Sequence, residues 1–250
     1  MNSRLINWFR FSSPATFYPL AGGMSRGFAW AAVALIAVGL YMSFFVAPTD
    51  YKQGEGYRII FVHVPAAWMS MLIYLVMAGW SFLGLVFNTR LSSMMATALA
   101  PTGALFTFIA LWTGAFWGKP MWGTWWVWDA RLTSELILLF LYIGFIALHS
   151  AIEDTRRADR ASAILCLVGA VNIPVIHYSV KWWNTLHQGA SVSVSSGSSM
   201  SAIMLYTMLV MTLGFWAYAI AVALSRVRCI ILERERESGW VKKLITENAL

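Results

Sequence analysis

The sequence predicts an all-α polytopic membrane protein with six transmembrane helices, both termini in the cytoplasm and a tryptophan-rich segment at the outer face. Of its 250 residues, 59% are hydrophobic and only 12% are charged, and the mean hydropathy is +0.65. That composition is typical of polytopic membrane proteins. Six apolar runs reach the roughly 20 residues that a helix needs to cross a bilayer. Lysine and arginine are unevenly shared among the loops between them, which indicates the orientation.

The six runs can be placed along the chain by their apolar residues. They cover about 28–46, 59–87, 94–116, 132–149, 161–180 and 201–224. An even number of spans puts both chain ends on one side, and the whole of 1–250 is predicted as a single membrane domain. The segment 1–27 mixes arginines with aromatic residues, and we expect Pro14 and Pro19 to break any long helix there. It is predicted as an interfacial foot on the cytoplasmic side. The first apolar run of the chain begins only at about residue 28, which is too late for a signal peptide, so no cleavage is expected.

The distribution of basic residues predicts which loops face outward. With the N-terminus inside, thirteen of the 18 Lys and Arg residues fall in inner segments, including the tail at 225–250. The five in outer loops are Lys52, Arg58, Lys119, Arg131 and Lys181. By the positive-inside rule both termini are cytoplasmic, in a bacterial inner membrane, and the outer loops face the periplasm. The membrane topology thus accounts for the net charge of +7. Membrane lipid is an expected partner, and no nucleic-acid partner is expected.

Several kinds of chemistry find no support in the sequence. Cys166 and Cys229 lie far apart and in no CxxC pattern, which argues against a disulfide scaffold, thiol–disulfide exchange or covalent haem attachment. The chain has no GxxxxGK[ST] run to hold nucleotide phosphates. We therefore expect no enzyme activity, and any ATPase would be a partner subunit.

The richest segment is 117–131, which opens the stretch WGKPMWGTWWVWDARLTSE at 117–135. It contains five of the chain's 14 tryptophans, namely Trp117, Trp122, Trp125, Trp126 and Trp128. Lysine, proline and two glycines, one of them Gly123, keep it out of the middle of a span. An aromatic surface at one mouth of the bundle suits a flat, apolar, polar-edged ligand such as a porphyrin. The alternative is an aromatic belt that anchors the protein at the lipid headgroups.

The four histidines separate by depth. His63 begins the second span and His187 follows the fifth, so both are predicted at the outer face beside the tryptophans. His177 falls inside the outer end of the fifth span, and His149 at the inner end of the fourth. A single histidine in a membrane protein is usually a packing residue. Two from different segments, however, are suited to bind haem iron from opposite faces.

Basic and acidic residues surround this segment, and the three basic ones have two interpretations each. Arg58, Lys119 and Arg131 can receive haem propionates or simply anchor the protein at the interface. Asp129 stands at a helix start, where capping is its expected role. Glu135 lies one turn inside the membrane, and Arg131 four residues earlier is its expected partner.

The segment from 117 onward resembles the tryptophan-rich WWD motif of the haem-handling family of cytochrome c maturation. FVHVPAAW, HYSVKWWNTLHQG and the spacing of six helices narrow the resemblance to the CcmC, or haem exporter protein C, members of system I. The similarity covers most of the chain and is tightest over about 47–190. Residues 1–27, the Ser-rich part of the loop at 181–200 and the tail carry little of it.

The resemblance implies a function and a set of residues. A protein of this family holds haem b non-covalently and transiently at its outer face and presents it to a periplasmic haem chaperone for covalent loading. It works beside an ABC-type ATPase subunit, a second polytopic subunit and a small single-span subunit. Mapped onto this sequence, the axial ligands of the haem iron are His63 and His187. The WWD residues that the motif supplies are Trp122, Gly123, Trp125, Trp126, Trp128 and Asp129, and Arg131 adjoins them.

Two other functions stay open from the residues. One is a single-haem membrane redox protein that meets a quinone; a two-haem relay would need a second histidine pair near the inner face, where only His149 is expected. The other is a structural permease subunit without haem, whose tryptophans only anchor it. That second alternative leaves the placement of His63 and His187 unexplained.

Overall fold

The computed structural model describes residues 12–187, 192–193, 197–198 and 200–248. The fold is that of an all-α polytopic membrane protein. The elements in chain order are α1 (Pro14–Tyr41), the π-helix η2 (Met42–Val46), the 3-10 helix η3 (Glu55–Ile59), α2 (Ile60–Phe87), α3 (Arg90–Trp122), α4 (Ala130–Ala151), α5 (Thr155–Gly169), α6 (Asn172–Trp182), the two-residue strands β1 (Val192–Ser193) and β2 (Gly197–Ser198), α7 (Ala202–Arg234) and α8 (Gly239–Asn248). Six helical segments of the described chain are long and apolar enough to cross a membrane. They match the six predicted spans in order, and most extend beyond them.

The first span differs from its prediction. Pro14 and Pro19 do not break it, because α1 runs without interruption from Pro14 to Tyr41. Pro14 lies in the first turn, where a missing N–H costs nothing. Pro19 removes only one hydrogen bond in the next turn, and the long apolar remainder sustains the helix. Of the interfacial foot predicted for 1–27, residues 1–11 lie outside the described chain.

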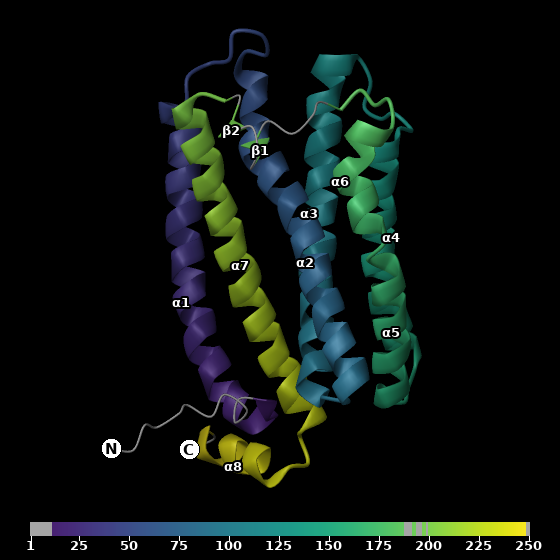
Figure 1. The fold of residues 1–250 in the computed structure, drawn as a ribbon. Helices are drawn as coiled ribbons and strands as arrows, with labels where there is room; N and C mark the ends of the chain where they lie inside the picture. The colour runs from purple at the N-terminus through teal and green to yellow at the C-terminus, as the bar shows by residue number, and fades with distance from the viewer. Residues whose placement is uncertain (1–11, 188–191, 194–196, 199, 249–250) are drawn as a thin grey trace, which may run out of the picture.

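Figure 1 shows the helices arranged as a bundle in which α1 and α7 pack together at one side. α2 and α3 form the centre, and α4 with α5 and α6 forms the other side. The first turn of α2, the last turns of α3 and α6 and the start of α4 meet at the upper end of Figure 1. We call this the Trp end, because it carries residues 117–131. At the opposite end, which we call the tail end, α8 lies across the bundle near the start of α1.

The fifth span is interrupted. α5 ends at Gly169 and α6 begins at Asn172, so one membrane crossing is built from two helices. The Asn172 side-chain amide donates to the Ser134 carbonyl of α4 at 2.9 Å. The break therefore lets the first residue of α6 form a polar cross-link to the first turns of α4.

The core joins α2, α3 and α4 through tyrosines. Tyr74 and Tyr142 are fully buried, with ring centroids 5.0 Å apart, and the Tyr142 hydroxyl donates to the Ser70 carbonyl at 2.7 Å. A Cβ on Gly103 would lie 2.1 Å from Cζ of Tyr142. Only glycine lets α3 approach α4 this closely.

The tail end is held by a charged cluster. Arg234 of α7 donates to both carboxylate oxygens of Asp159 on α5, at 2.8 Å each. Nε2 of His149 on α4 lies 3.0 Å from Oδ1 of the same carboxylate. A bidentate pair of this kind is strong and directional, so it ties three helices together. His149 is thus engaged at the end opposite the tryptophans.

Candidate functional site at the Trp end

His63 lies in the first turns of α2 and is buried, with 9% of its surface exposed. Its Nδ1 is 3.0 Å from the Ala110 carbonyl oxygen and 3.0 Å from Oγ1 of Thr113, both on α3. A carbonyl can only accept, so Nδ1 carries the ring proton and donates it. In the neutral ring this leaves the lone pair on Nε2. A backbone acceptor on the far nitrogen is the usual way to orient a metal-binding imidazole.

One face of α3 is shaped around this ring. Ala110, Thr113, Gly114 and Trp117 recur at intervals of three and four residues, which places them on one side of a helix. A Cβ on Gly114 would come 3.1 Å from Cε1 of His63, so glycine leaves room for the imidazole. The Trp117 ring meets the His63 ring edge-on, with centroids 5.7 Å apart and planes at 75°. The face combines an acceptor, a small residue and an aromatic wall.

His187 comes to the same place from the segment after α6. Its ring centroid lies 6.2 Å from that of His63, with the planes inclined by 35°, and 6.3 Å from that of Trp122. Two imidazoles bound to opposite faces of one metal ion, with metal–nitrogen bonds of about 2.0–2.1 Å, have centroids roughly 6.4 Å apart. The spacing of the two rings therefore fits two imidazoles that occupy the two axial positions of one metal ion.

The first outer loop closes one side of the site. Nε1 of Trp117 donates to the Gln53 side-chain oxygen at 2.9 Å. Asp50 orders that loop, because its Oδ1 accepts from the backbone N–H groups of Lys52 and Gln53 at 2.9 and 2.8 Å. Gly54 then takes a positive φ of 58°. The loop is therefore tied to the ring that touches His63.

Arg58 and Lys119, both candidates for propionate binding, have partners in the protein. Arg58 pairs with Glu55 and donates to the carbonyls of Ser43 and Ala47, the latter at 2.9 Å. Lys119 donates to the Gly123 carbonyl at 3.0 Å. Both hold the backbone at the Trp end, and the cation of each is already engaged within the protein.

The Trp segment begins as helix. α3 continues through Pro120 to Trp122 and ends at Gly123, whose φ of 78° is costly for residues with a side chain. The Trp122 ring folds back over Gly118, where a Cβ would lie 3.1 Å from its Cε3. Trp117 and Trp122 therefore face the histidines from the last turns of a rigid helix.

The later tryptophans lie elsewhere. Trp125 packs edge-on against Phe116, 5.4 Å between centroids, and is 51% exposed. Trp126 contacts Trp128 at 5.4 Å, and Trp128 is 75% exposed. These rings have no ring contact with either histidine among the described residues. The WWD segment thus contains inward rings, represented by Trp122, and outward ones.

Asp129 caps α4 as predicted. Its Oδ1 accepts from the Leu132 N–H at 2.8 Å. Its Oδ2 is buried and has no hydrogen-bond partner in the described part of the chain, and the same is true of Nε1 of Trp126. Two unsatisfied buried polar atoms within the WWD residues are costly for the folded protein. They are suited to a polar ligand group or a water.

The expected pairing of Arg131 with Glu135 is wrong as a direct contact. The Arg131 guanidinium turns to α6 and donates to the Ile176 carbonyl at 2.7 Å. Glu135 accepts instead from the Ser70 hydroxyl of α2 at 2.7 Å. Inside a bundle, inter-helix partners compete with the i,i+4 neighbour, and here tertiary contacts take both groups. Arg131 remains close enough to His63 to act on it electrostatically.

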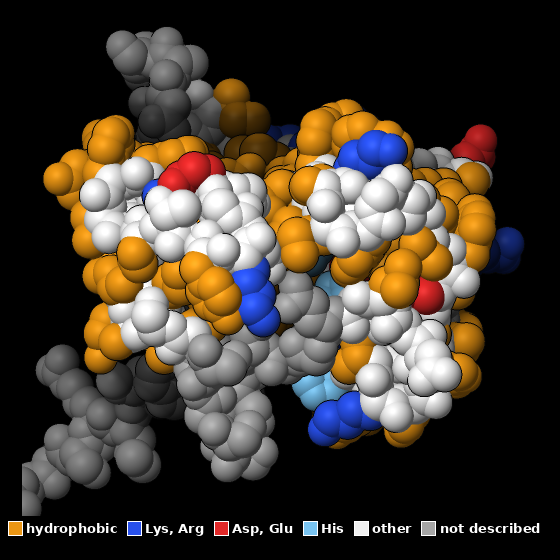
Figure 2. Space-filling model, turned by 90° about the horizontal axis from the view of Figure 1, so that it is seen from above, with side chains coloured by type: hydrophobic (Ala, Val, Ile, Leu, Met, Phe, Trp, Pro, Cys, Tyr) orange, Lys and Arg blue, Asp and Glu red, His pale blue; other side chains and the backbone are white. Residues whose placement is uncertain are grey.

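Sequence reasoning and structure overlap in part. The structure brings His63, His187, Trp122 and the charge of Arg131 together at the Trp end, while Trp125 and Trp128 lie on its surface. Reasoning from sequence missed Thr113, Gly114 and Gln53, and the small-residue spacing on α3 was the available signal for the first two. Figure 2 looks onto this end and shows histidine atoms near its centre, among hydrophobic side chains and close to Lys and Arg.

Comparison with known proteins identifies the family. The family model described as "Heme exporter protein C" matches residues 7–242. The chain is 50% identical to the Heme exporter protein C of Escherichia coli K12, over 93% of this chain and 94% of that one. It is 45% identical to the protein of that name from Haemophilus influenzae, over 94% and 95%. It is also 54% identical to a putative cytochrome c biosynthesis ccmC-like mitochondrial protein of Marchantia polymorpha, over 67% and 69%. Matches of this extent mean that the chain belongs to the CcmC, or haem exporter protein C, family.

Proposed function

We propose that this protein handles haem in cytochrome c maturation by holding haem b at the Trp end, with His63 and His187 as the two axial ligands of the iron. The observation that carries the proposal is the pair of imidazole centroids 6.2 Å apart, one of them with Nδ1 committed to a backbone carbonyl. Haem in this role is cargo, so the protein acts as a carrier and not as an enzyme. Its family name, Heme exporter protein C, supports haem as the cargo.

The surroundings of the two rings supply what a porphyrin needs. Trp117 and Trp122 give apolar aromatic contact beside the imidazoles. Asp129 Oδ2 and Trp126 Nε1 are polar atoms without partners among the described residues. Arg131 adds a positive charge near His63, suited to a haem propionate. In this site Gly123 ends the helix that carries Trp122.

The exposed tryptophans suit delivery of the cargo. Trp125, Trp128, Trp182 and Trp183 are each at least half exposed, and all belong to segments at the Trp end. A concentration of exposed aromatic surface is typical of a protein–protein or membrane contact. We assign these rings to docking a periplasmic haem chaperone that takes haem covalently. The inward rings then hold the haem.

The orientation follows from the charge distribution. Thirteen of the 18 basic residues belong to segments expected at the tail end, which includes α8. The positive-inside rule therefore places α8 and the start of α1 in the cytoplasm of a bacterium, and the Trp end at the periplasmic face of its inner membrane. The relatives' name supports membership of an export complex, and we propose an ABC-type ATPase subunit, a second polytopic subunit and a small single-span subunit as its members.

The absorption spectrum of the purified protein with bound haem tests the ligand assignment. The variants are His63→Ala and His187→Ala. His177→Ala is the matched control, because this exposed histidine lies on α6 and packs against Tyr178. We expect six-coordinate low-spin haem in the native protein and in His177→Ala. We expect lost or high-spin haem in the other two. An unchanged spectrum in either His63→Ala or His187→Ala would remove that residue from the iron.

A redox function with haems at both faces finds no support in the histidines. His149 is engaged with Asp159 and Arg234 at the tail end. The other three histidines, all of them in the described part of the chain, lie toward the Trp end. A second bis-histidine site therefore has no pair to use. If the native protein bound no haem at all, the tryptophans would be an anchoring belt and the structural-subunit alternative would stand.

A further inference from the structure

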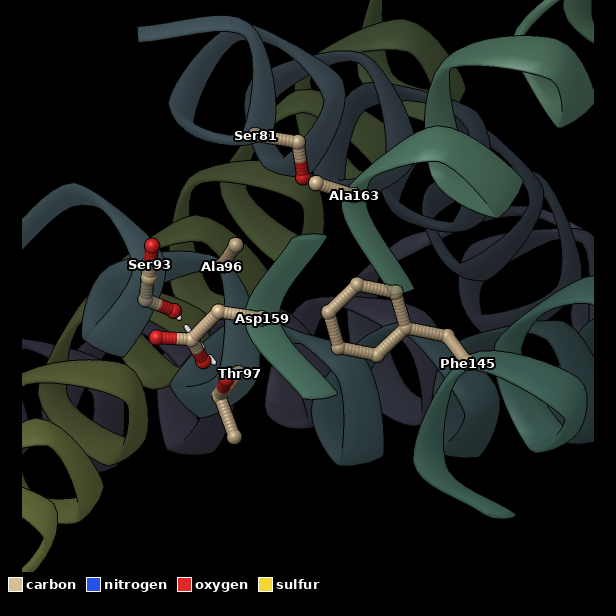
Figure 3. Close-up of a pocket in the computed structure, with 7 residues that line it drawn as sticks. All are labelled: Ser81, Ser93, Ala96, Thr97, Phe145, Asp159 and Ala163. Carbon is tan, nitrogen blue, oxygen red and sulfur yellow. Dashed lines mark hydrogen bonds between the residues drawn. The ribbon is translucent and has the colours of Figure 1, made fainter. Parts of the chain in front are cut away.

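A groove lies at the tail end, away from the proposed haem site. It is lined by the end of α2, the start of α3 and the first half of α5. Arg90, Arg156 and Arg160 line it, and Asp159 is the one carboxylate among the described residues that line it. A smaller pocket adjoins it deeper in the bundle, and Figure 3 shows Asp159 pointing there toward Ser93 and Thr97 of α3.

The charge of this groove is positive. The Asp159 carboxylate is already neutralised by the bidentate Arg234 and is also contacted by His149. Arg90 is paired with Glu235 at 3.2 Å. Arg156 and Arg160 form no ion pair within the described chain, although both are on one helix, four residues apart. Like charges at this spacing repel each other, so the arrangement favours an anion between them.

The groove also offers backbone N–H donors at the start of α3. Thr89, the N-cap of α3, makes no side-chain bond to the helix backbone, and its hydroxyl donates to the Ser92 hydroxyl at 2.7 Å. The first N–H groups of a helix lack internal partners and attract negative charge. Here those of α3 lie at the groove, beside Arg90. Cations and backbone donors together match a phosphate group.

The α5 surface beyond the arginines is apolar and exposed. On α5 the positions four and eight residues beyond Arg160 are Ile164 and Val168, which are 56% and 68% exposed. This helix belongs to a predicted span, so these side chains face the lipid phase. A ligand with a charged head and apolar tails would follow this sequence of surfaces.

We propose that the groove between α2, α3 and α5 binds the phosphate group of an anionic phospholipid in the leaflet at the tail end. Arg156 and Arg160 contact the phosphate, and the acyl chains lie along the exposed face of α5. A soluble phosphate compound shares the same headgroup chemistry, so the test separates the two sources. The proposal is independent of the haem function.

The test uses the full-length protein in detergent, with bound lipid counted by native mass spectrometry and the midpoint of thermal unfolding recorded. Phosphatidylglycerol is titrated against phosphatidylcholine, and inorganic phosphate against chloride at equal ionic strength. The variant is Arg156→Gln/Arg160→Gln. The control is Arg157→Gln, which removes one exposed arginine from the same helix outside the groove. Both target side chains are exposed, and Arg156→Lys/Arg160→Lys keeps their charge if the Gln variant fails to fold.

We expect the native protein and Arg157→Gln to retain phosphatidylglycerol in preference to phosphatidylcholine. In the double Gln variant the affinity for phosphatidylglycerol should fall on the order of 30-fold, because each of the two basic side chains near an anionic surface contributes about fivefold. The Lys variant should keep most of the affinity. Stabilisation by inorganic phosphate that the double variant loses would support the phosphate site with a soluble source. Equal retention in all variants, or no preference for phosphatidylglycerol and no effect of phosphate, would overturn the proposal.

Discussion

The imidazole rings of His63 and His187 lie with their centroids 6.2 Å apart, although one belongs to α2 and the other follows α6. Their planes are inclined by only 35°, and the ring centroid of Trp122 lies 6.3 Å from that of His187. The relationship requires the start of one span and the loop after another to meet above the end of α3.

Gly114 leaves the space that the His63 ring fills. A Cβ there would come 3.1 Å from Cε1 of His63, and the branched side chain of Gly114→Val would press further. We expect the imidazole to move and the low-spin fraction of bound haem to fall, measured by absorption spectroscopy. Gly79→Val is the control, because a Cβ at Gly79 meets nothing within 4 Å. Equal spectra for the two variants would mean that the close approach to His63 does not matter.

Thr113 shares the Nδ1 proton of His63 with the Ala110 carbonyl. Thr113→Val keeps the shape and removes one acceptor, so the ring is less firmly oriented. We expect haem affinity to fall on the order of tenfold, because losing a group that orients a metal ligand costs 10–100-fold and one acceptor remains. Haem titration measures it. Thr107→Val is the control, since its buried hydroxyl donates to the Gly103 carbonyl within α3. A loss as large in that control would indicate a general effect on the helix.

The outward tryptophans are expected to act in delivery. Trp125→Ala with Trp128→Ala, which removes two exposed rings, should weaken haem loading of the chaperone more than it lowers the amount of protein in the membrane. Trp122→Ala should instead reduce haem retained by the protein itself, because its ring lies against His187. Loading assays and immunoblots of membranes make the comparison. If abundance fell as much as loading, the tryptophans would be structural anchors.

Asp129 has two oxygens with different surroundings. Asp129→Ala removes the cap of α4 and should cost about 1 kcal/mol of stability. Asp129→Asn keeps a capping oxygen, so its free energy of unfolding should stay near that of the native protein. If Oδ2 meets a polar group of the ligand, the Asn variant will still bind haem more weakly. Thermal unfolding and haem titration separate the two effects, and native haem affinity in Asp129→Asn would limit Asp129 to capping.

Residue patterns were sufficient to predict parts of the fold that depend on local properties. Six spans follow from apolar length, because a bilayer excludes unsatisfied backbone. The cap of α4 follows from Asp129 at the start of that helix. The prediction that Pro19 breaks the first helix is wrong, because a proline near a helix start removes only one hydrogen bond when a long apolar helix follows. These features depend on neighbours in sequence.

The sequence by itself determined the membrane class, the order of the spans, the family resemblance and the two histidines worth testing. Only the tertiary structure decided which groups meet: Thr113 and Ala110 hold His63, Ser70 takes Glu135, and Ile176 takes Arg131. It also separated Trp122 from the exposed Trp125 and Trp128. The physical reason is that buried polar groups bond to the partner that packing brings nearest, and in a helix bundle that partner usually lies on another helix.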